Sequence, residues 1–407
     1  MVFVGIDWAE AHNDVLVMDA AGAVLSAARV PVGVEGLARL HALVADHAEE
    51  PGEVIVGIEL DQGLLVRSLA GAGYQVYAIN PLAASRYRDR HTTSGAKSDA
   101  GDARLLADLV RTDRHNHRPL AGDSDEAGAI KVLARAHQAL VWTRQRQVNA
   151  LRSGLRDYFS AALVAFGDDL AAPDALAVLQ IAPTPERGRA LSRSKIASAL
   201  RRGGRQRNVE RRAAEIQLLL RGEHPAAAPI MAEAFGAATQ ARVAVIASLV
   251  GQIAELEARL QEHFERHPDA EILRSLPGLG LVLGARVLGE FGDDPTRYAD
   301  ARGRKAYAGT APITKASGRS RIVLARVARN KHLADACEWW AFCSLTSSAG
   351  SRRYYDALRG RGKTNHQALR QLANRWVGIL HHCLEARVTY QEALAWPEPA
   401  AELKLVA

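Results

Sequence analysis

The chain has 407 residues, 48% of them apolar, and a mean hydropathy of −0.11, which predicts roughly two or three domains with ample core material. No apolar run approaches the roughly 18 residues of a membrane span, and no basic-then-apolar leader opens the sequence, so neither membrane insertion nor secretion is expected. The net charge of +7 suggests a polyanionic partner. Cys337, Cys343 and Cys383 form no CxxC pair, which argues against structural zinc or disulfides and for a reducing cytoplasm.

Residues 1 to about 118 alternate strand and helix signals. Three runs of β-formers come first (VFVGID, DVLVMDA and VLSAARVPV), with AAG as a hairpin turn between the second and third. A helix over 35–48, a strand over 53–60, a helix over 63–73 and a strand stopped by Pro81 follow. Because a three-strand meander followed by βαβ crossovers is the order of ribonuclease-H-like folds, we predict a RuvC-like α/β domain here.

Four acidic residues of this domain are the candidate catalytic groups. Asp7 and Glu59 each end a run of β-formers, and Asp99 and Asp102 stand three apart in the helix-like stretch SDAGDARLLADLVR. Four carboxylates in one place repel one another, and a pair of magnesium-type ions would neutralise them. The set therefore indicates two-metal chemistry on phosphodiesters. Taken singly, a strand-end aspartate is as often a turn former.

The middle of the chain is helical. Residues 129 to 159 combine an apolar face with a face of arginines and one lysine. Residues 246 to 260 carry apolar side chains at alternating intervals of three and four, namely Ile246, Leu249, Ile253, Leu256 and Leu260. This is a coiled-coil seam of about two heptads, which either joins subunits or pairs within one chain.

A basic segment lies between these helices. Residues 186 to 212 hold nine Arg and one Lys against two Glu. A charge run is commonly only a solvated face, but this one exceeds what solubility requires. We therefore expect nucleic-acid phosphates to contact Arg201, Arg202, Arg205 and Arg207.

The last domain begins near residue 268 with a glycine-rich turn between two apolar helical patterns. Such a Pro-Gly-x-Gly hairpin directs backbone N–H groups at a phosphate, as in helix-hairpin-helix DNA binding, although any tight helix–helix turn uses glycines. The residues expected to contact nucleic acid here are Gly278 and Gly280.

Residues 301 to 331 contain nine Lys or Arg and no Asp or Glu. Ser317 lies among them, close to Lys315, Arg319 and Arg321. A hydroxyl on a glycine-bounded turn among cations could attack a phosphorus whose oxygens the cations hold. On spacing alone, an ordinary turn residue is the favoured interpretation.

The order VGID, GIE, K-S-D-x-x-D-A, a helical arm, LPGLG and then Y-A-G-T-A-P-x-x-x-x-S-G resembles the DEDD transposases of the insertion sequence 110 family. These are also known as bridge-RNA-guided recombinases, and Piv-type site-specific DNA invertases are relatives. The resemblance covers about residues 2 to 390.

The resemblance implies that Asp7, Glu59, Asp99 and Asp102 bind Mg²⁺, in a pair for which Mn²⁺ can substitute. It implies that Ser317 becomes covalently joined to DNA; Ser320 lies close by, and the A-P-x-x-x-x spacing favours Ser317. It also implies a composite site, in which the metal-bearing domain of one subunit faces the serine domain of another.

Four segments are expected in this α/β plus α protein. They are a RuvC-like domain at 1–118, a dimerising helical coiled-coil arm with the basic insert at 119–267, a mainly helical C-terminal transposase domain at 268–395, and a tail at 396–407. The expected function is a bacterial, cytoplasmic, nucleoid-associated transposase that works as a dimer or tetramer. Its partners are donor and target DNA and a non-coding guide RNA that pairs with both.

Three alternatives remain open. A structure-selective nuclease resembling Holliday-junction resolvases would use water in place of serine. A site-specific invertase would use the same chemistry on other DNA. A non-catalytic RNA-binding protein would have structural carboxylates only.

Overall fold

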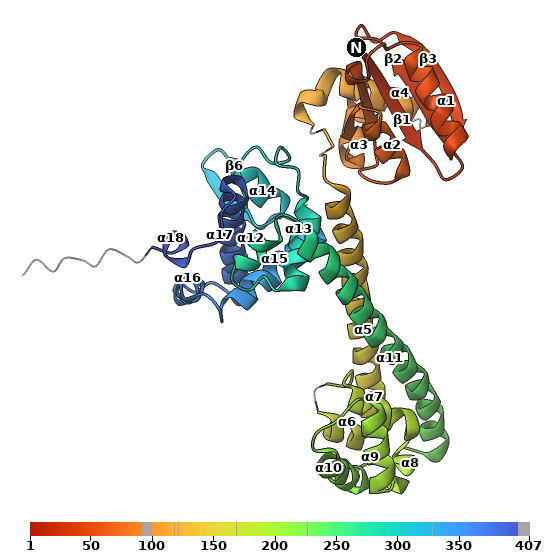
Figure 1. The fold of residues 1–407 in the computed structure, drawn as a ribbon, viewed down its shortest axis with the longest axis vertical. Coiled ribbons are helices and arrows are strands. Elements are labelled where there is room, and N and C mark those ends of the chain that lie inside the picture. The colour runs from red at the N-terminus through yellow and green to blue at the C-terminus, as the bar shows by residue number, and fades with distance from the viewer. Residues whose placement is uncertain are drawn as a thin grey trace, which may run out of the picture. The chain divides into compact units, whose positions relative to one another are not determined.

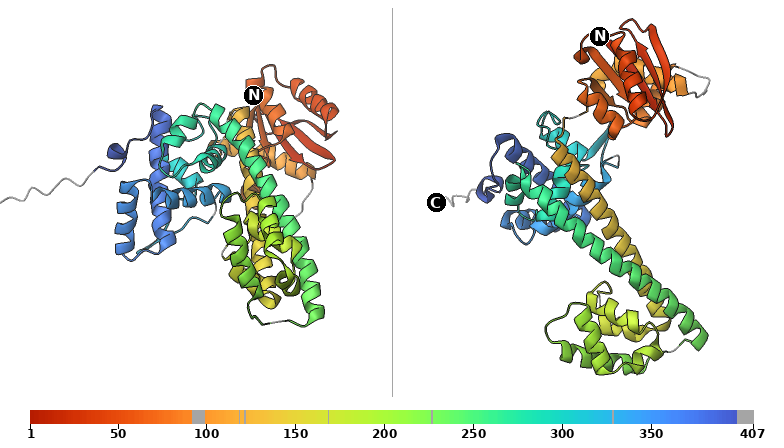
Figure 2. Two further views of the ribbon diagram at one scale, coloured as in Figure 1. Left: turned by 60° about the horizontal axis from the view of Figure 1, so that its bottom comes forward. Right: turned by 45° about the vertical axis from the view of Figure 1, so that its right-hand side comes forward.

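The computed structural model describes residues 1–91, 99–117, 119–120, 122–167, 169–225, 227–327 and 329–397. Two compact units make up the chain, Met1–Gly122 and Asp123–Ala407. The first is an α/β unit and the second is almost entirely helical (Figures 1 and 2). The mixed fold class expected from the sequence is therefore confirmed at this level.

The first unit is built on a five-stranded sheet in the order β3-β2-β1-β4-β5. Strands β1, β2 and β3 form an antiparallel meander, and β4 and β5 extend it parallel to β1. The chain turns at residues 20–22 between β2 and β3, as predicted, with Gly22 at a φ of 90°. The strands are β1 (Val2–Trp8), β2 (His12–Met18), β3 (Val24–Pro31), β4 (Val54–Ile58) and β5 (Gln75–Ala78).

Helices cover both faces of this sheet. Alternate residues of β1 and β4 pack with Leu40 of α1 (Val34–Ala45) and with Leu69 of α2 (Leu64–Gly71). The other alternate residues pack with α3 (Pro81–His91) and α4 (Asp99–Asp113). The first unit is thus a three-layer α/β/α arrangement. The sequence analysis predicted every one of these elements except α3, which begins at Pro81 itself.

Two glycines that pair across β1 and β4 bring α4 onto the sheet. Gly5 and Gly57 are register partners. A Cβ on Gly5 would lie 1.8 Å from the backbone oxygen of Ala103, and one on Gly57 would lie 2.6 Å from that of Leu106. Both contacts are to backbone, so α4 lies against the sheet at a distance that only glycine permits.

The second unit contains two long antiparallel helices, α5 (Asp125–Tyr158) and α11 (Pro229–Arg266), which pack along each other. Glu126 pairs with His263 toward one end of this arm, and Tyr158 donates a hydrogen bond to Thr239 toward the other. Five shorter helices form a lobe at the second end: α6 (Ser160–Phe166), α7 (Pro173–Ile181), α8 (Pro185–Ala190), α9 (Arg193–Arg202) and α10 (Val209–Arg221).

The remaining elements form a C-terminal lobe with its own hydrophobic core, in which Trp340 and Trp376 are fully buried. In chain order they are α12 (Ala270–Ser275), α13 (Leu281–Phe291), α14 (Ala301–Tyr307), β6 (Ile313–Ser317), β7 (Ser320–Leu324), α15 (Lys331–Ser344), α16 (Ala349–Gly360), α17 (Asn365–Ala386) and α18 (Glu392–Ala395). Strands β6 and β7 pair as an isolated antiparallel hairpin.

The predicted heptad seam lies on α11. Ile246, Ile253 and Leu260 are buried, whereas Leu249 and Leu256 are half-buried. Ile246 and Leu260 belong to the two cores to which α5 also contributes, and α11 packs along α5. The seam therefore pairs within one chain, and these three side chains are not available to join subunits.

Helix α11 is also the one helix of the described residues that is long and apolar enough, by length and composition, to cross a membrane. The sequence predicted no membrane span, because it contains no long uninterrupted apolar run. Because α11 packs along α5 and also carries Arg242, Glu255 and Arg259, this is weak evidence for a membrane span.

The glycine contact under α4 leads to a stability prediction. Gly5→Ala is expected to lower the free energy of unfolding by about 1–3 kcal/mol or more, because the new methyl group meets the backbone of α4 and cannot be accommodated by a rotamer change. Gly52→Ala is the control, since a Cβ there would meet nothing within 4 Å, and its change should stay within about 0.5 kcal/mol. Urea denaturation of the full chain measures both, and equal stabilities would contradict this packing.

Candidate functional site

The strand pairing places the acidic residues of the sheet on one face. Residues directly opposite in an antiparallel pair share a face, and Asp7 of β1 pairs with Asp14 of β2. Gly5, two residues before Asp7, faces α4, so Asp7 does too. Ile6 and Ile58 are parallel partners, so Glu59 follows β4 at the same edge as Asp7. The carboxylates of Asp7, Asp14 and Glu59 thus gather on the α4 side of the sheet.

Helix α4 adds two further carboxylates at this edge. It runs antiparallel to β1, because Ala103 lies over Gly5 and later residues of α4 lie farther back along the sheet. Its first turn is therefore beside the carboxyl end of β1, and that turn carries Asp99 and Asp102. Asp99 is exposed, whereas Asp102 is buried at 8%. The four predicted acids thus lie on elements that meet at one edge of the first unit, but of the four only Asp99 belongs to the group of side chains, among the described residues, whose ligand atoms lie close enough together to hold a metal ion.

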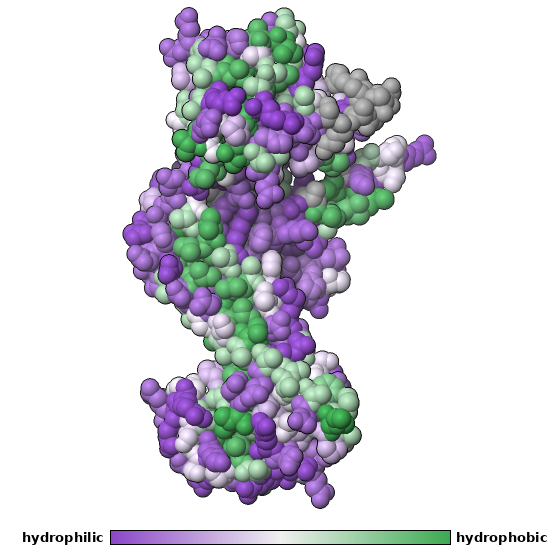
Figure 3. Space-filling view, turned by 90° about the vertical axis from the view of Figure 1, so that its right-hand side faces the viewer, coloured by the Kyte–Doolittle hydropathy of each residue, from purple (hydrophilic) through white to green (hydrophobic). Residues whose placement is uncertain are grey.

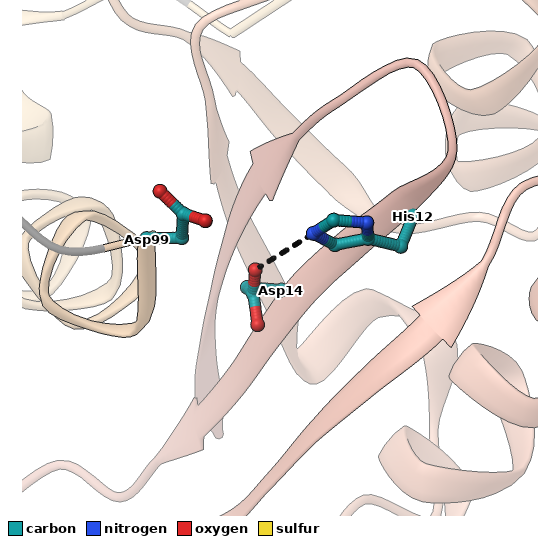
Figure 4. Close-up of side chains that lie close together, drawn as sticks. All are labelled: His12, Asp14 and Asp99. Carbon is teal, nitrogen blue, oxygen red and sulfur yellow. Dashed lines mark ion pairs between the residues drawn. The ribbon is translucent and has the colours of Figure 1, made fainter.

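His12 and Asp14 join this edge and were not predicted. One donor atom from each of His12, Asp14 and Asp99 lies within 4.8 Å of the others. Figure 4 shows the imidazole of His12 directed at the carboxylate of Asp14, with Asp99 on the neighbouring helix. The distance between His12 Nε2 and Asp14 Oδ2 is 3.7 Å. A polar residue in the buried strand HNDVLVM was the available sequence signal for Asp14.

Two arginines contact these acids. Arg29, the β3 partner of Asp14, donates to both of its carboxylate oxygens at 3.1 and 3.0 Å and reaches Asp99 at 3.5 Å. The hydrogen bond with Asp14 raises the pKa of Arg29 above its usual value. Arg88 of α3 pairs with Asp102. These guanidinium groups balance part of the negative charge that burial makes costly.

The donors at this edge fit a hard divalent cation. Carboxylate oxygens are the ligands that Mg²⁺ and Mn²⁺ prefer. His12 Nε2 is buried and makes no hydrogen bond among the described residues, so it is an additional donor without a hydrogen-bond partner. A cation here would compete with Arg29 at Asp99 and with Arg88 at Asp102.

The predicted nucleophile lies at the tip of the β6–β7 hairpin in the C-terminal lobe. Ser317 ends β6 and Ser320 begins β7, and the two are direct partners across the turn formed by Gly318 and Arg319. Gly318 has a φ of 54°, which favours glycine there. Both serines are exposed and share one face of the hairpin. The structure therefore brings both candidate serines together and does not separate them.

The cations around Ser317 are arranged differently from the expected ring. Lys315 pairs with Ile322 and shares the face of Ser317, while Arg319 is in the turn. Arg321 pairs with Ala316, so its side chain leaves from the opposite face. Within the wider basic run, Arg304 is buried and stacks on Tyr298 with 4.7 Å between the guanidinium carbon and the ring centroid. Arg304 is thus a packing residue.

The glycine-rich turn joins α12 and α13, as predicted. Gly278 has a φ of 82°, and a Cβ there would lie 2.6 Å from the backbone nitrogen of Ser344, so packing against α15 explains this glycine. Gly280 caps α13, is exposed, and has nothing near its Cβ position. The backbone N–H groups in the first turn of α13 therefore lie at a surface, beside Gly280, that a phosphate can approach.

The four arginines of the basic insert fall into two classes. Arg201 pairs with Glu210 at 2.8 Å, and Arg205 pairs with Asp174. These pairs connect α9 and the following loop to α10 and α7, so both arginines have structural roles. Arg202 and Arg207 are exposed, and neither forms an ion pair among the described residues. They are the better candidates for phosphate contacts.

Two family models match the chain. A model of DEDD transposases of IS110 elements, described as Transposase, matches residues 4–160, which include the acidic edge and α5. A model described as Transposase IS116/IS110/IS902 family matches residues 270–356, which include the glycine-rich turn and the serine hairpin.

Relatives align over almost the full length. The chain is 44% identical to the mini-circle putative transposase for IS117 of Streptomyces coelicolor, covering 97% of this chain and 96% of that protein. It is 31% identical to the insertion element IS900 uncharacterized 42 kDa protein of Mycobacterium paratuberculosis, with 96% and 98% covered. It is also 31% identical to the insertion element IS110 uncharacterized 43.6 kDa protein of Streptomyces coelicolor, with 88% of each covered. The chain belongs to the IS110 family of transposases.

Proposed function

We propose that this transposase moves its insertion sequence by metal-assisted attack of a serine on DNA, guided by a non-coding RNA. Membership of the family implies an enzyme that binds, cuts and rejoins DNA. The observation that carries the finer proposal is the convergence of Asp7, Glu59, Asp99 and Asp102 at one edge of the first unit. The protein acts in the bacterial cytoplasm at the nucleoid.

A RuvC-like assignment of the first unit is supported by its strand order. The order β3-β2-β1-β4-β5, with an antiparallel meander and two parallel crossovers, is the arrangement of ribonuclease-H-like folds. In it, the carboxyl ends of β1 and β4 are adjacent, which is why acids at the ends of these strands meet.

Asp7, Glu59, Asp99 and Asp102 would hold a pair of Mg²⁺ ions, with His12 and Asp14 beside them. Bound divalent ions would supply Lewis-acid activation of the attacking hydroxyl and charge stabilisation at the leaving oxygen. Arg29 and Arg88 keep Asp99 and Asp102 in place before the ions bind, and then become available to phosphate oxygens.

Ser317 carries out the covalent step. Its hydroxyl loses a proton and its oxygen bonds to the scissile phosphorus, while the bond from phosphorus to the leaving sugar oxygen breaks and that oxygen takes up a proton. The phosphoserine ester conserves the bond energy, so the hydroxyl of a second DNA end can displace the serine without ATP. The lack of a GxxxxGK[ST] motif in the sequence fits this scheme.

A second, exposed seam on α11 supports self-association. Small residues recur there at intervals of three and four: Ala244, Ala247, Gly251, Ala254 and Ala258. Figure 3 shows apolar surface running along the arm. Beside this seam, α7, α9 and α11 enclose a mainly apolar cavity of about 600 Å³. Small side chains at this spacing let a second helix approach closely, so we propose that two subunits pair along this face.

Two alternatives within phosphodiester chemistry have separate signatures. A resolvase-like nuclease would use water and form no covalent adduct, and an invertase would act on DNA within one replicon. The exposed serine hairpin favours the covalent scheme over the first of these.

The metal proposal predicts the behaviour of isosteric variants. Asp99→Asn and Asp102→Asn should lower recombination on the order of a hundredfold or more and abolish the thermal stabilisation that Mn²⁺ gives the wild-type protein. Asp61→Asn, an exposed carboxylate two residues after Glu59 that is not part of the His12–Asp14–Asp99 group, is the matched control and should keep both. Wild-type Mn²⁺ stabilisation in Asp102→Asn would refute the assignment.

The serine proposal predicts that Ser317→Ala folds and binds DNA but forms no covalent adduct. Ser320→Ala should retain part of its activity, although Ser320 lies directly across the hairpin. Mass spectrometry of trapped adducts identifies the modified residue. A phosphodiester on Ser320, or no adduct in the wild-type protein, would overturn the role of Ser317.

The assembly proposal concerns the second seam. Ala247→Glu combined with Ala254→Glu should shift the protein toward monomer in light scattering, because two carboxylates would be buried without partners. Ser248→Glu places the same charge on another exposed side of α11 and should leave the oligomer unchanged. An unchanged oligomer in the double variant would place the contact elsewhere.

A further inference from the structure

Two exposed tryptophans border a cavity between the arm and the C-terminal lobe. Trp142 of α5 is 38% exposed and Trp339 of α15 is 53% exposed. Both line a cavity of about 370 Å³ enclosed by α5, α13 and α15, which pack against one another in the second unit (Figure 1). This volume is within the range of small-molecule sites, about 300–1,000 Å³.

The aromatic rings of this cavity are fixed by their neighbours. Trp142 stacks on His332 with 5.6 Å between ring centroids and 19° between planes. Trp339 meets Phe342 edge-on at 5.9 Å, and Phe342 is itself 52% exposed. Exposed indole rings held in place in this way offer stacking surface at little cost in side-chain entropy.

The polar groups of the cavity form a connected network. Gln138 Oε1 accepts a hydrogen bond from His332 Nδ1 at 2.9 Å, and Gln138 Nε2 donates to Asp335, which also pairs with Arg286. Asp335 is therefore neutralised by its neighbours. Such a network fixes the cavity wall in one arrangement.

One buried histidine in the cavity wall has a ring nitrogen without a hydrogen-bond partner among the described residues. His137 lines the cavity with an exposed fraction of 7%, and its Nδ1 makes no hydrogen bond among the described residues. Burial lowers the pKa of His137, so its ring is neutral near pH 7, with one nitrogen as a hydrogen-bond donor and the other as an acceptor. Nε of Arg286, another wall residue, also lacks a partner among these residues. Both nitrogens are themselves shielded from the cavity, which therefore offers an occupant mainly its aromatic faces.

The approach to the cavity is basic. Arg146 is exposed and lies one helical turn after Trp142 on α5, and Arg144 lies between them. Aromatic faces beside arginines are the combination that binds unpaired nucleotides, with the base stacked and the phosphate on the cation.

We propose that this cavity holds one unpaired nucleobase of a bound nucleic-acid strand, stacked on Trp339, the more exposed of the two rings, with its phosphate at Arg146. The proposal rests on the proposed function only in requiring that a nucleic acid is bound. The occupant is a base that has left its duplex, because a paired base keeps both faces within the stack.

The test uses the full-length protein and fluorescence anisotropy with labelled hairpin oligonucleotides. Three matched probes are compared, in RNA and in DNA: a fully paired hairpin, the same hairpin with one extrahelical adenosine, and that hairpin with an abasic residue in place of the adenosine. The wild-type protein should bind the extrahelical adenosine about tenfold more tightly than either other probe. The preference in RNA or in DNA identifies which strand supplies the base.

Variants of Trp339 separate base stacking from apolar docking. Trp339→Leu keeps apolar bulk and should abolish the preference, whereas Trp339→Phe keeps an aromatic face and should retain most of it. Val132→Ala removes another exposed apolar side chain of the second unit and should change nothing. Circular dichroism melting confirms that each variant is folded.

The outcomes are distinct from those of the proposed function. Equal affinity of the wild-type protein for all three probes would overturn the base site and leave nucleic-acid binding intact. Failure to bind any probe would contradict both. An abasic probe that binds as tightly as the adenosine probe would show recognition of the bent backbone alone, and would also overturn the base site.

Discussion

The close approach of α4 to the sheet determines the candidate active site. Gly5 and Gly57 are side by side on β1 and β4, and the backbone of α4 occupies the space that their side chains would need. This contact fixes the level of α4 along β1, and so places Asp99 and Asp102 beside the strand ends that carry Asp7 and Glu59. The two glycines thus set the position of the helix that carries two of the acids relative to the strands that carry the other two.

Gathering acidic side chains at one edge raises the electrostatic free energy of the first unit, and arginine side chains of the same unit offset part of it. Asp102 is buried and pairs with Arg88, while Asp14 and Asp99 share Arg29. Removing one partner of such a pair leaves an uncompensated charge. A cluster of carboxylates without bound metal ions is therefore stable only if cationic side chains of the protein neutralise it. The arginines and the metal ions of the proposed chemistry are therefore competitors for the same carboxylates.

The sequence predicted the elements of the first unit well, because β-branched runs and helical periodicity are local signals. The four acids were selected by their places at strand ends and in one helical turn, and their role as metal ligands stays a prediction. It could not predict Asp14 or Arg29, whose importance depends on the register that places them opposite Asp7 and each other. Similarly, the spacing of Ile246, Ile253 and Leu260 defines an apolar helix face but not its partner, which is α5 of the same chain. Pairing across the β6–β7 hairpin placed Arg321 on the face away from Ser317, which its position in the sequence did not reveal.

The second unit presents its functional residues in a different way from the first. In the first unit Asp102 is buried and Asp7 and Glu59 are half-buried, whereas Asp99 is exposed, and arginine side chains contact Asp99 and Asp102. In the second unit the serine hairpin is exposed along both strands, with Ile322 and Val323 more than half exposed, and the small-residue seam of α11 and the tryptophans at the α5–α13–α15 cavity are exposed as well. Exposed apolar and aromatic groups are costly in water unless a partner covers them. These exposed groups are where the proposed nucleic-acid and self-association contacts would form, whereas the candidate metal site of the first unit is assembled by contacts within that unit.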